Sequence, residues 1–320
     1  MIIGIDTSCY TTSLAIIDRG GNLIEDARKV LSVKPGRRGL QQSEAVFQHV
    51  QNLPFLLEKV SQKIDFTEIK AVCVSTKPRP VEKSYMPVFT VSHGFGKVLA
   101  LGKQISLFLT THQEGHLMAG IWSAKGPEGK EFLAVHLSGG TSEVLRVKKH
   151  KTGFFIEILG ATGDLHAGQF VDRIGVALGM PFPAGSHLEK LAATYSGEIP
   201  YLKTGVKGYD FSFSGPETAA RKLLAEGNPP EAVARAVEQC VATTLEKVLR
   251  RAVSDTGLKE ILIVGGVAAN SYIRQRLVYR LEHRAVGAKL FFAEPVYSTD
   301  NAVGIAQIGL LIYNNNEKNK

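Results

Sequence analysis

The sequence has few of the features that mark exported or membrane proteins. Its 320 residues include 3 cysteines, Cys9, Cys73 and Cys240. These are widely separated and odd in number, so neither a disulfide framework nor a structural zinc knuckle is indicated. No apolar run approaches the roughly 20 residues that a membrane-spanning helix needs, and residues 1–5 are too short for a signal-peptide core. We therefore expect a cytoplasmic protein with no membrane partner.

The composition is that of an ordinary globular protein, with 44% hydrophobic and 21% charged residues. It excludes a disordered or fibrous chain. The length predicts about two domains. A net charge of +8 allows a polyanionic partner by long-range attraction, although a basic enzyme without one would show the same charge.

Apolar segments of strand and helix type alternate along the chain, and the order is repeated. In the first half we predict strands at residues 2–5, 13–18, 71–75 and 105–109 and helices at 41–63 and 94–103. In the second half we predict strands at residues 132–137, 143–147 and 261–264 and helices at 169–178, 231–253 and 271–282. Each half opens with a hairpin that has a small polar turn, at residues 6–8 and 138–142. Two such α/β halves predict a duplicated, two-lobed fold with a central cleft.

Three polar or glycine-rich elements could contact a nucleotide. The Ser138–Ser142 turn offers unobstructed backbone N–H groups and hydroxyls to a phosphate, although a Gly-Gly pair between strands is commonly only a turn. Residues 261–270 predict a buried strand that runs through glycines into a helix, without the full dinucleotide-binding spacing. Asp6 could hold Mg²⁺ against phosphates of ATP or AMP, or could simply form its own turn. In this order, the elements favour the two-lobed superfamily of actin and the heat-shock ATPases (the ASKHA fold).

The run Thr111-His112-Gln113-Glu114-Gly115-His116 separates two histidines by four residues. On a helix both imidazoles would share one face, which suits a divalent transition metal, but a helix cap or a hydrogen-bonded surface pair has the same spacing. Asp300, before the last apolar helix, is a candidate third ligand. The zinc-protease pattern needs Glu directly after the first histidine, and Gln113 stands there.

With these pieces together, the chain resembles the TsaD family, also called Gcp, nearly from end to end. The matching stretches are residues 4–9, 111–117 with the core H-x-E-G-H, 137–140, 168–185, 210–215 (Asp-Phe-Ser-Phe-Ser-Gly), 265–270 and 298–301. The resemblance implies two actin-like domains with ribonuclease-H-like topology, over residues 1–125 and 126–320, with the last helix packed back on the first domain.

The activity that the resemblance implies is transfer of a threonylcarbamoyl group from its adenylate to the adenosine next to the tRNA anticodon. Tyr10 and Asp6 are the catalytic candidates. By the same resemblance an iron or zinc ion is held by His112, His116 and Asp300, and partner proteins of the same pathway are expected. The residues implied to bind the adenylate or nucleotide are Leu137, Ser138, Gly139, Gly140, Thr141, Asp172, Gly185 and Asn270.

The chain departs from the family pattern mainly near the expected reaction centre. Tyr10-Thr11 replaces an acidic pair, residues 77–80 replace a Gly-Pro-Gly turn, Thr141-Ser142 replaces His-Thr, and Glu217 stands where Lys is customary. Such a pattern indicates a divergent paralogue. Besides the transferase, two alternatives stay open: a non-catalytic subunit that keeps nucleotide and metal, and a carbamoyltransferase acting on a small molecule.

Overall fold

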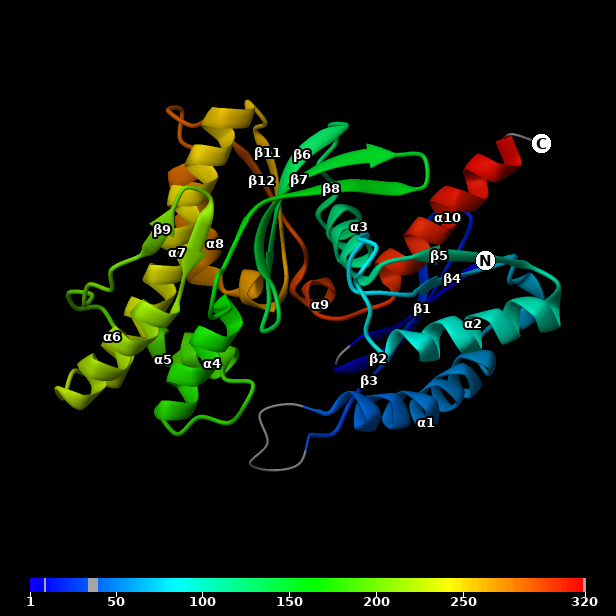
Figure 1. The fold of residues 1–320 in the computed structure, drawn as a ribbon, viewed down its shortest axis with the longest axis horizontal. Coiled ribbons are helices and arrows are strands. Elements are labelled where there is room, and N and C mark those ends of the chain that lie inside the picture. Colours follow the sequence, from blue (N-terminus) through cyan, green and yellow to red (C-terminus); the bar gives the residue numbers. More distant parts are fainter. Residues whose placement is uncertain (9, 34–39, 319–320) are drawn as a thin grey trace. The chain divides into compact units, whose positions relative to one another are not determined.

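The computed structural model describes residues 1–8, 10–33 and 40–318 (Figure 1). The chain divides into two compact units. Unit 1 comprises Met1–Ser123, Lys149–Phe155 and Thr299–Lys320, and unit 2 comprises Ala124–Lys148 and Ile156–Ser298. Within the described ranges, we find no helix with both the length and the apolar character needed to span a bilayer.

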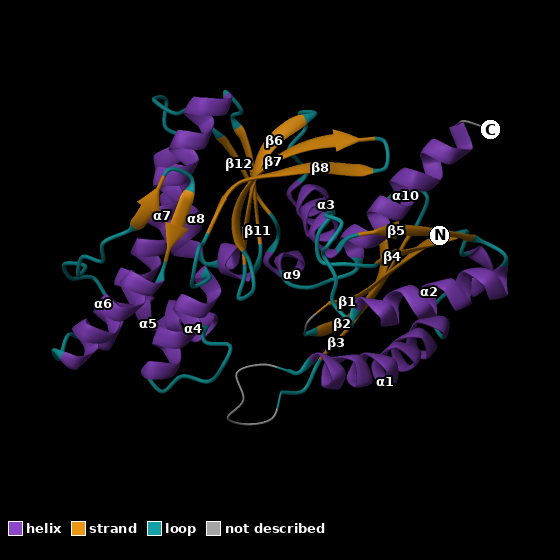
Figure 2. Ribbon diagram, in the orientation of Figure 1, coloured by secondary structure: helices purple, strands orange, loops and turns teal. Residues whose placement is uncertain are grey.

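Unit 1 is built on a five-stranded sheet with the order β3-β2-β1-β4-β5 (Figure 2). Its strands are β1 Ile2–Ser8, β2 Thr11–Ile17, β3 Leu23–Val30, β4 Ala71–Ser75 and β5 Ser106–Thr110. Its helices are α1 Gln42–Ser61, α2 Phe89–Lys103, α3 His112–Ala124 and α10 Val303–Lys318. β1 pairs antiparallel with β2 and parallel with β4, which confirms an α/β unit opened by a hairpin.

The two faces of this sheet carry different helices because side chains alternate along a strand. Ile3 and Ile5 of β1 join the apolar core that includes residues of α1 and α2. On the opposite face the backbone of Gly4 meets Ala306 of α10, and Gly309 of α10 meets Cys73 of β4. Asp6 has the same parity as Gly4, so its side chain belongs to the face that α10 covers.

The predicted turn at residues 6–8 was wrong, because β1 continues through Ser8. The side chains of Asp6 and Thr7 are buried but have partners within the fold. The Thr7 hydroxyl donates to the carbonyl of Val88 at 2.8 Å and accepts from the amide of Ser92 at 3.1 Å. Asp6 is fully buried inside the strand and pairs with Ser13. Asp6 is therefore held in a strand and does not form its own turn.

Unit 2 repeats the plan, with a sheet of order β12-β11-β6-β7-β8. Its strands are β6 Glu131–Leu137, β7 Ser142–His150, β8 Gly153–Ala161, β11 Glu260–Val264 and β12 Lys289–Phe292, with a separate hairpin of β9 Gly205–Lys207 and β10 Asp210–Ser212. The end of β7 and the start of β8, within residues 149–155, belong to unit 1. Its helices are α4 Ala167–Ala177, α5 Gly185–Ala193, α6 Ser214–Ala225, α7 Pro230–Thr256, α8 Ser271–Leu281 and the short α9 Pro295–Ser298. Like β1, β6 is antiparallel to its hairpin partner and parallel to the strand on its other side.

The core of unit 2 lies between this sheet and its helices. Leu133, Val135 and Leu137 of β6 point into it, and α7 contributes a long apolar face. The sequence of α7 is rich in alanine and valine, which lets it pack closely against α5 and α8. β6 and β11 are paired in parallel, so the turns that follow these two strands leave the same edge of the sheet.

Candidate metal centre and phosphate loop

Three ligand atoms converge within unit 1. Nε2 of His112 lies 3.1 Å from Nε2 of His116, and Oδ1 of Asp300 lies 3.4 Å from His116 and 3.7 Å from His112. The two histidines occupy one face of α3, and Asp300 immediately precedes α10. Among the described residues these three form a group that could hold a metal ion.

Helix α3 begins where it does because Thr111 and Glu114 form a capping box. The Thr111 hydroxyl accepts from the amide of Glu114 at 3.3 Å, and the Glu114 carboxylate accepts from the amide of Thr111 at 3.1 Å. Carbonyls of Lys77 and Pro78 accept the N–H groups of His112 and Gln113, at 3.0 and 2.9 Å. The Glu of the H-x-E-G-H core thus caps the helix that presents both histidines. The T-x-x-E spacing could have revealed this role from the sequence.

A close crossing of α3 and α10 brings Asp300 to the histidines. A Cβ atom on Gly304 would lie 1.8 Å from the carbonyl oxygen of Gly115, so a side chain there cannot fit without moving one helix. The segment before α10 is also fixed from β3, where Arg28 donates to Thr299 at 3.3 Å and to the carbonyl of Asp300 at 3.4 Å. Gly115 of the H-x-E-G-H core also faces α10, since a Cβ there would lie 2.5 Å from Cδ1 of Ile305.

Asp6 contacts the other ring nitrogen of His112. Its Oδ2 lies 3.1 Å from Nδ1, and its Oδ1 accepts a short hydrogen bond from the hydroxyl of Ser75. A carboxylate on the far nitrogen fixes the tautomer and orientation of an imidazole so that Nε2 is free to bind a metal. Asp6 is therefore placed to support the metal group from behind.

The electrostatics of the group favour a cation. Burial acts to lower the pKa of His112, but the carboxylates of Asp6 and Asp300 outweigh it and raise that pKa to about 9. Burial and the neighbouring charge of His112 lower the pKa of His116. Burial acts against ionisation of Asp300, yet contacts with both histidines hold its pKa well below the usual range. Without a metal, a proton on His112 supplies the positive charge between the two carboxylates.

The donor set fits zinc or iron. Ligand atoms bound tetrahedrally at zinc–nitrogen and zinc–oxygen lengths are about 3.3 Å apart, and the three observed separations of 3.1, 3.4 and 3.7 Å bracket that value. Two imidazoles with one carboxylate also match the ligands of non-haem iron sites. The three residues leave further coordination positions to be filled by other oxygen or nitrogen donors.

Tyr10 stands at the tip of the first hairpin, where its side chain is 42% exposed. Its carbonyl accepts from the amide of Leu31 at 2.8 Å, which fixes the backbone next to β3. Cys9, which belongs to one matching stretch, lies outside the described residues. Glu217, which stands where the family usually has Lys, pairs with Arg221 at 2.5 Å on the same face of α6.

The predicted phosphate loop in unit 2 follows β6, after Leu137. The hydroxyl of Ser138 accepts from the amides of Gly140 at 3.2 Å and Thr141 at 2.9 Å, so the turn is held by its own first residue. A Cβ on Gly139 or Gly140 would meet nothing within 4 Å. Open space therefore faces this backbone, as a phosphate-binding loop requires.

The other residues predicted to bind the nucleotide lie near the starts of α5 and α8, where side chains of neighbouring helices accept backbone hydrogen bonds. Asp172 of α4 accepts from the amide of Ala184 at 2.8 Å, just before Gly185 begins α5. Glu189 of α5 accepts from the amide of Ser271 at 2.8 Å, at the start of α8. These bonds connect α4 to α5 and α5 to α8. Asp172 thus contacts the residue before Gly185, and Glu189 contacts the residue after Asn270.

Asn270 itself caps α8 and is held by a buried acid that the sequence did not reveal. Its Oδ1 accepts from the amide of Ile273 at 2.9 Å, and its Nδ2 donates to Glu238 of α7 at 2.6 Å. Burial raises the pKa of Glu238 to about 7, although Asn270 and Arg235 oppose the shift. Glu238 also pairs with Arg235, three residues earlier in α7. Its contact with Asn270 joins residues 32 positions apart, so no local pattern reveals it.

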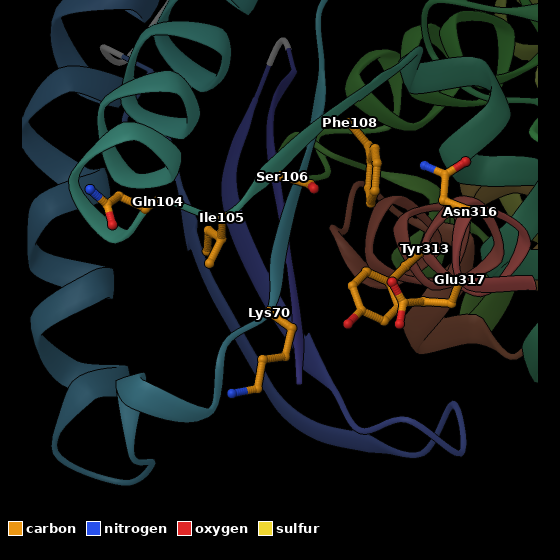
Figure 3. Close-up of a pocket in the computed structure, with 8 residues that line it drawn as sticks. All are labelled: Lys70, Gln104, Ile105, Ser106, Phe108, Tyr313, Asn316 and Glu317. Atoms are coloured by element: carbon orange, nitrogen blue, oxygen red, sulfur yellow. The ribbon is translucent and has the colours of Figure 1, made fainter. Parts of the chain in front are cut away.

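A separate hollow of about 460 Å³ lies beside the starts of β4 and β5 in unit 1 (Figure 3). It is lined by Lys70 before β4, by residues 104–106 at the start of β5, and by Tyr313 and Glu317 of α10. The metal group instead follows the carboxyl end of β5. The hollow shares no residue with the group.

Comparison with known proteins decides the family. The family model described as tRNA N6-adenosine threonylcarbamoyltransferase, TsaD, matches residues 27–307. The chain belongs to the TsaD family. A relative named tRNA N6-adenosine threonylcarbamoyltransferase from Archaeoglobus fulgidus is 30% identical over 311 residues, covering 97% of this chain and 91% of that protein. The protein of the same name from Thermus thermophilus is also 30% identical, covering 95% of this chain and 90% of its own length.

Solved structures confirm the ASKHA fold for this TsaD-family chain. An activator of 2-hydroxyisocaproyl-CoA dehydratase from Clostridium difficile, with bound ADPNP, covers the whole chain with a TM-score of 0.56 at 15% identity, and 97% of that protein is covered. A ROK family glucokinase from Streptomyces griseus covers 96% of this chain and 98% of its own with a TM-score of 0.53 at 11% identity. At these identities the likeness concerns the fold alone.

Proposed function

We propose that this chain transfers the threonylcarbamoyl group of threonylcarbamoyl-AMP to the adenosine next to the anticodon of a tRNA. Family membership supports the reaction class. The observation that carries the proposal for this chain is the convergence of His112, His116 and Asp300 on one point. The chain keeps this group although the acidic pair after residue 9 is absent.

In this proposal His112, His116 and Asp300 hold an iron or zinc ion. When bound, the ion supplies Lewis-acid polarisation of an acyl oxygen and holds that oxygen in place. Asp6 keeps the Nδ1 proton of His112, which leaves Nε2 as the ligand atom. Thr111 and Glu114 hold the first turn of α3, so both imidazoles keep their positions while substrate binds.

The adenylate is assigned to unit 2. The backbone N–H of Gly139 contacts its phosphate, since Gly139 and Gly140 are exposed and free of side chains, whereas the amides of Gly140 and Thr141 donate to the Ser138 hydroxyl within the turn. Leu137 and Thr141 delimit this loop, and Asp172, Gly185 and Asn270 contribute from the helix starts described above. Hydrogen bonds to the AMP phosphate stabilise the leaving group as the carbamoyl bond breaks.

The tRNA is attracted by the positive charge of the protein, which carries +8 overall. The reaction takes place in the cytoplasm. Tyr10, exposed at the hairpin tip, is the candidate to replace the missing acids: its phenol oxygen accepts a hydrogen bond from the adenosine amine, whose proton passes to water. Mg²⁺ accompanies any ATP or AMP that binds, and pathway proteins supply the adenylate.

Reconstitution tests the proposal. Purified protein, threonylcarbamoyl-AMP and unmodified tRNA are incubated, and modified adenosine is detected by nucleoside mass spectrometry. We expect product with the wild type and a large loss with His112→Ala. Absence of product, under conditions where another family member works, would reject the transferase.

Metal content gives a second readout that does not need activity. The wild type should carry about one equivalent of iron or zinc, and His116→Ala should lose most of it. His93→Ala, at an exposed position of α2, is the matched control and should keep the metal. A protein that binds metal and AMP but forms no product would fit the non-catalytic subunit indicated by Tyr10-Thr11.

A further inference from the structure

The run Asp210-Phe211-Ser212-Phe213-Ser214-Gly215 has no part in the site described so far. It covers β10 and the start of α6 in unit 2. Its two serines could be read as nucleophiles or phosphate ligands. Their hydroxyls instead face a single carboxylate, that of Asp164, which lies in the segment between β8 and α4.

The carboxylate of Asp164 accepts five hydrogen bonds, one of them from the Thr162 hydroxyl to Oδ1 at 3.2 Å. The Ser212 hydroxyl donates to Oδ2 at 2.5 Å, and the Ser214 hydroxyl donates to the same oxygen. The amide of Phe213 donates to Oδ1 at 3.3 Å, and that of Leu165 donates to it as well. These donors hold the pKa of the Asp164 carboxyl well below its usual range, against the effect of partial burial. The carboxylate is thus ionised and bound to the run at neutral pH.

Further contacts join the same two segments. The amide of Gly163 donates to the carbonyl of Phe211 at 3.2 Å, and the amide of Ala161 donates to Oδ1 of Asp210 at 3.2 Å. The Phe213 ring is fully buried and stacks on Phe170 of α4, with centroids 5.7 Å apart. Each residue from Asp210 to Ser214 therefore contacts the segment of residues 161–170.

Residues 162–168 in turn hold both ends of the phosphate loop. The amide of Gly168 donates to the carbonyl of Ser138 at 3.2 Å. The amide of Ala167 donates to the hydroxyl of Ser142 at 2.9 Å, and the amide of Thr162 donates to its carbonyl at 3.0 Å. The loop that these bonds hold spans only Ser138 to Ser142, so it has little freedom to move independently of this segment.

We infer that Asp164 is a positioning residue which, clamped by Ser212 and Ser214, fixes the 138–142 loop in the form that receives the adenylate phosphate. The inference rests on the proposed function for its ligand. The serines then act through Asp164 and do not touch substrate. Loss of the carboxylate would loosen residues 162–168 and, with them, both anchors of the loop.

The test uses the full-length protein with Asp164→Asn and, separately, Ser214→Ala, which removes only one of the five donors. Hydrogen–deuterium exchange is measured on peptides that cover residues 138–142 and 162–168. AMP binding is measured by calorimetry. Asp18→Asn is the control, because Asp18 is also an exposed turn carboxylate that accepts from Asn22 twice, at 2.8 Å each, but lies in unit 1.

We expect Asp164→Asn to exchange about tenfold faster in both peptides and to bind AMP about tenfold more weakly, as loss of roughly one charged hydrogen bond would give. Ser214→Ala should change both readouts in the same direction by less, and Asp18→Asn should change neither. Exchange that is unaltered in Asp164→Asn would overturn the clamp. If the wild type does not bind AMP while Asp164→Asn still loosens the loop, the clamp stands and the adenylate site of the proposed function is rejected.

Discussion

Replacing Gly304 by alanine should separate α10 from α3 and empty the metal group. The added Cβ would lie 1.8 Å from the carbonyl oxygen of Gly115 and 2.6 Å from the amide nitrogen of Ala119. Both are backbone atoms of α3, so no side-chain rotation relieves the overlap. The two helices must move apart, or the first turn of α10 must unwind.

The size of the effect follows from these contacts. Ordinary non-bonded separation is about 3.5 Å, so the helices must part by roughly 1.5 Å. Overpacking of this kind costs about 1–3 kcal/mol, and the backbone nature of the contact places this site at the upper end. The greater helix propensity of alanine returns at most about 1 kcal/mol. We expect a net loss near 2 kcal/mol in the free energy of unfolding.

The effect on metal binding should be larger than the effect on stability. Asp300 lies four residues before Gly304 and moves with it, whereas metal–ligand distances tolerate only about 0.2 Å. The variant should therefore fold, with a Tm lower by about 4–8 °C, and carry little metal after equilibration with zinc. Thermal unfolding and elemental analysis of the dialysed protein measure the two effects.

Two other glycines supply the controls. Gly94, at an exposed position of α2, has nothing within 4 Å of a Cβ, so Gly94→Ala should stabilise the protein by about 0.5–1 kcal/mol and leave the metal content unchanged. Gly115→Ala should have a stability and a metal content between those of Gly94→Ala and Gly304→Ala. The nearest neighbour of its added Cβ is the flexible end of the Ile305 side chain, at 2.5 Å. If Gly304→Ala keeps its metal and has the same Tm as Gly94→Ala, the close helix crossing does not exist in solution.

Two further outcomes are expected. Asp6→Asn should weaken zinc affinity about 10- to 100-fold through loss of the carboxylate behind His112, measured by competition with a chromogenic chelator; unchanged affinity would show that Asp6 does not orient His112. Burial raises the pKa of Glu238 from 4.5 to about 7, so the stability this group contributes is complete below pH 4.5 and lost as pH rises through 7. Glu238→Gln lacks this titration, so its stability relative to the wild type should increase from pH 5 to pH 8 by up to about 3 kcal/mol in chemical denaturation, and a pH-independent difference would contradict the buried ionisation.

The secondary structure around the sites could be predicted because its signals are local. The four-residue spacing of His112 and His116 predicted a shared helix face, and α3 confirms the helix. The turn at 138–142 was also placed correctly between two strands. The turn at residues 6–8 failed because polarity was taken to mean exposure, whereas Asp6 and Thr7 find partners inside the fold.

By itself the sequence determined many of the elements, because hydrophobic periodicity and small polar turns act over a few residues, but strands such as β3, β8 and β12 were not predicted. Only the tertiary structure decided which distant groups meet. Asp300 reaches His116 across 184 positions because two helices cross at Gly115 and Gly304. Asp164 likewise meets Ser212 and Ser214 because β10 passes beside the segment before α4. Such contacts depend on the path of the whole chain, which no local spacing encodes.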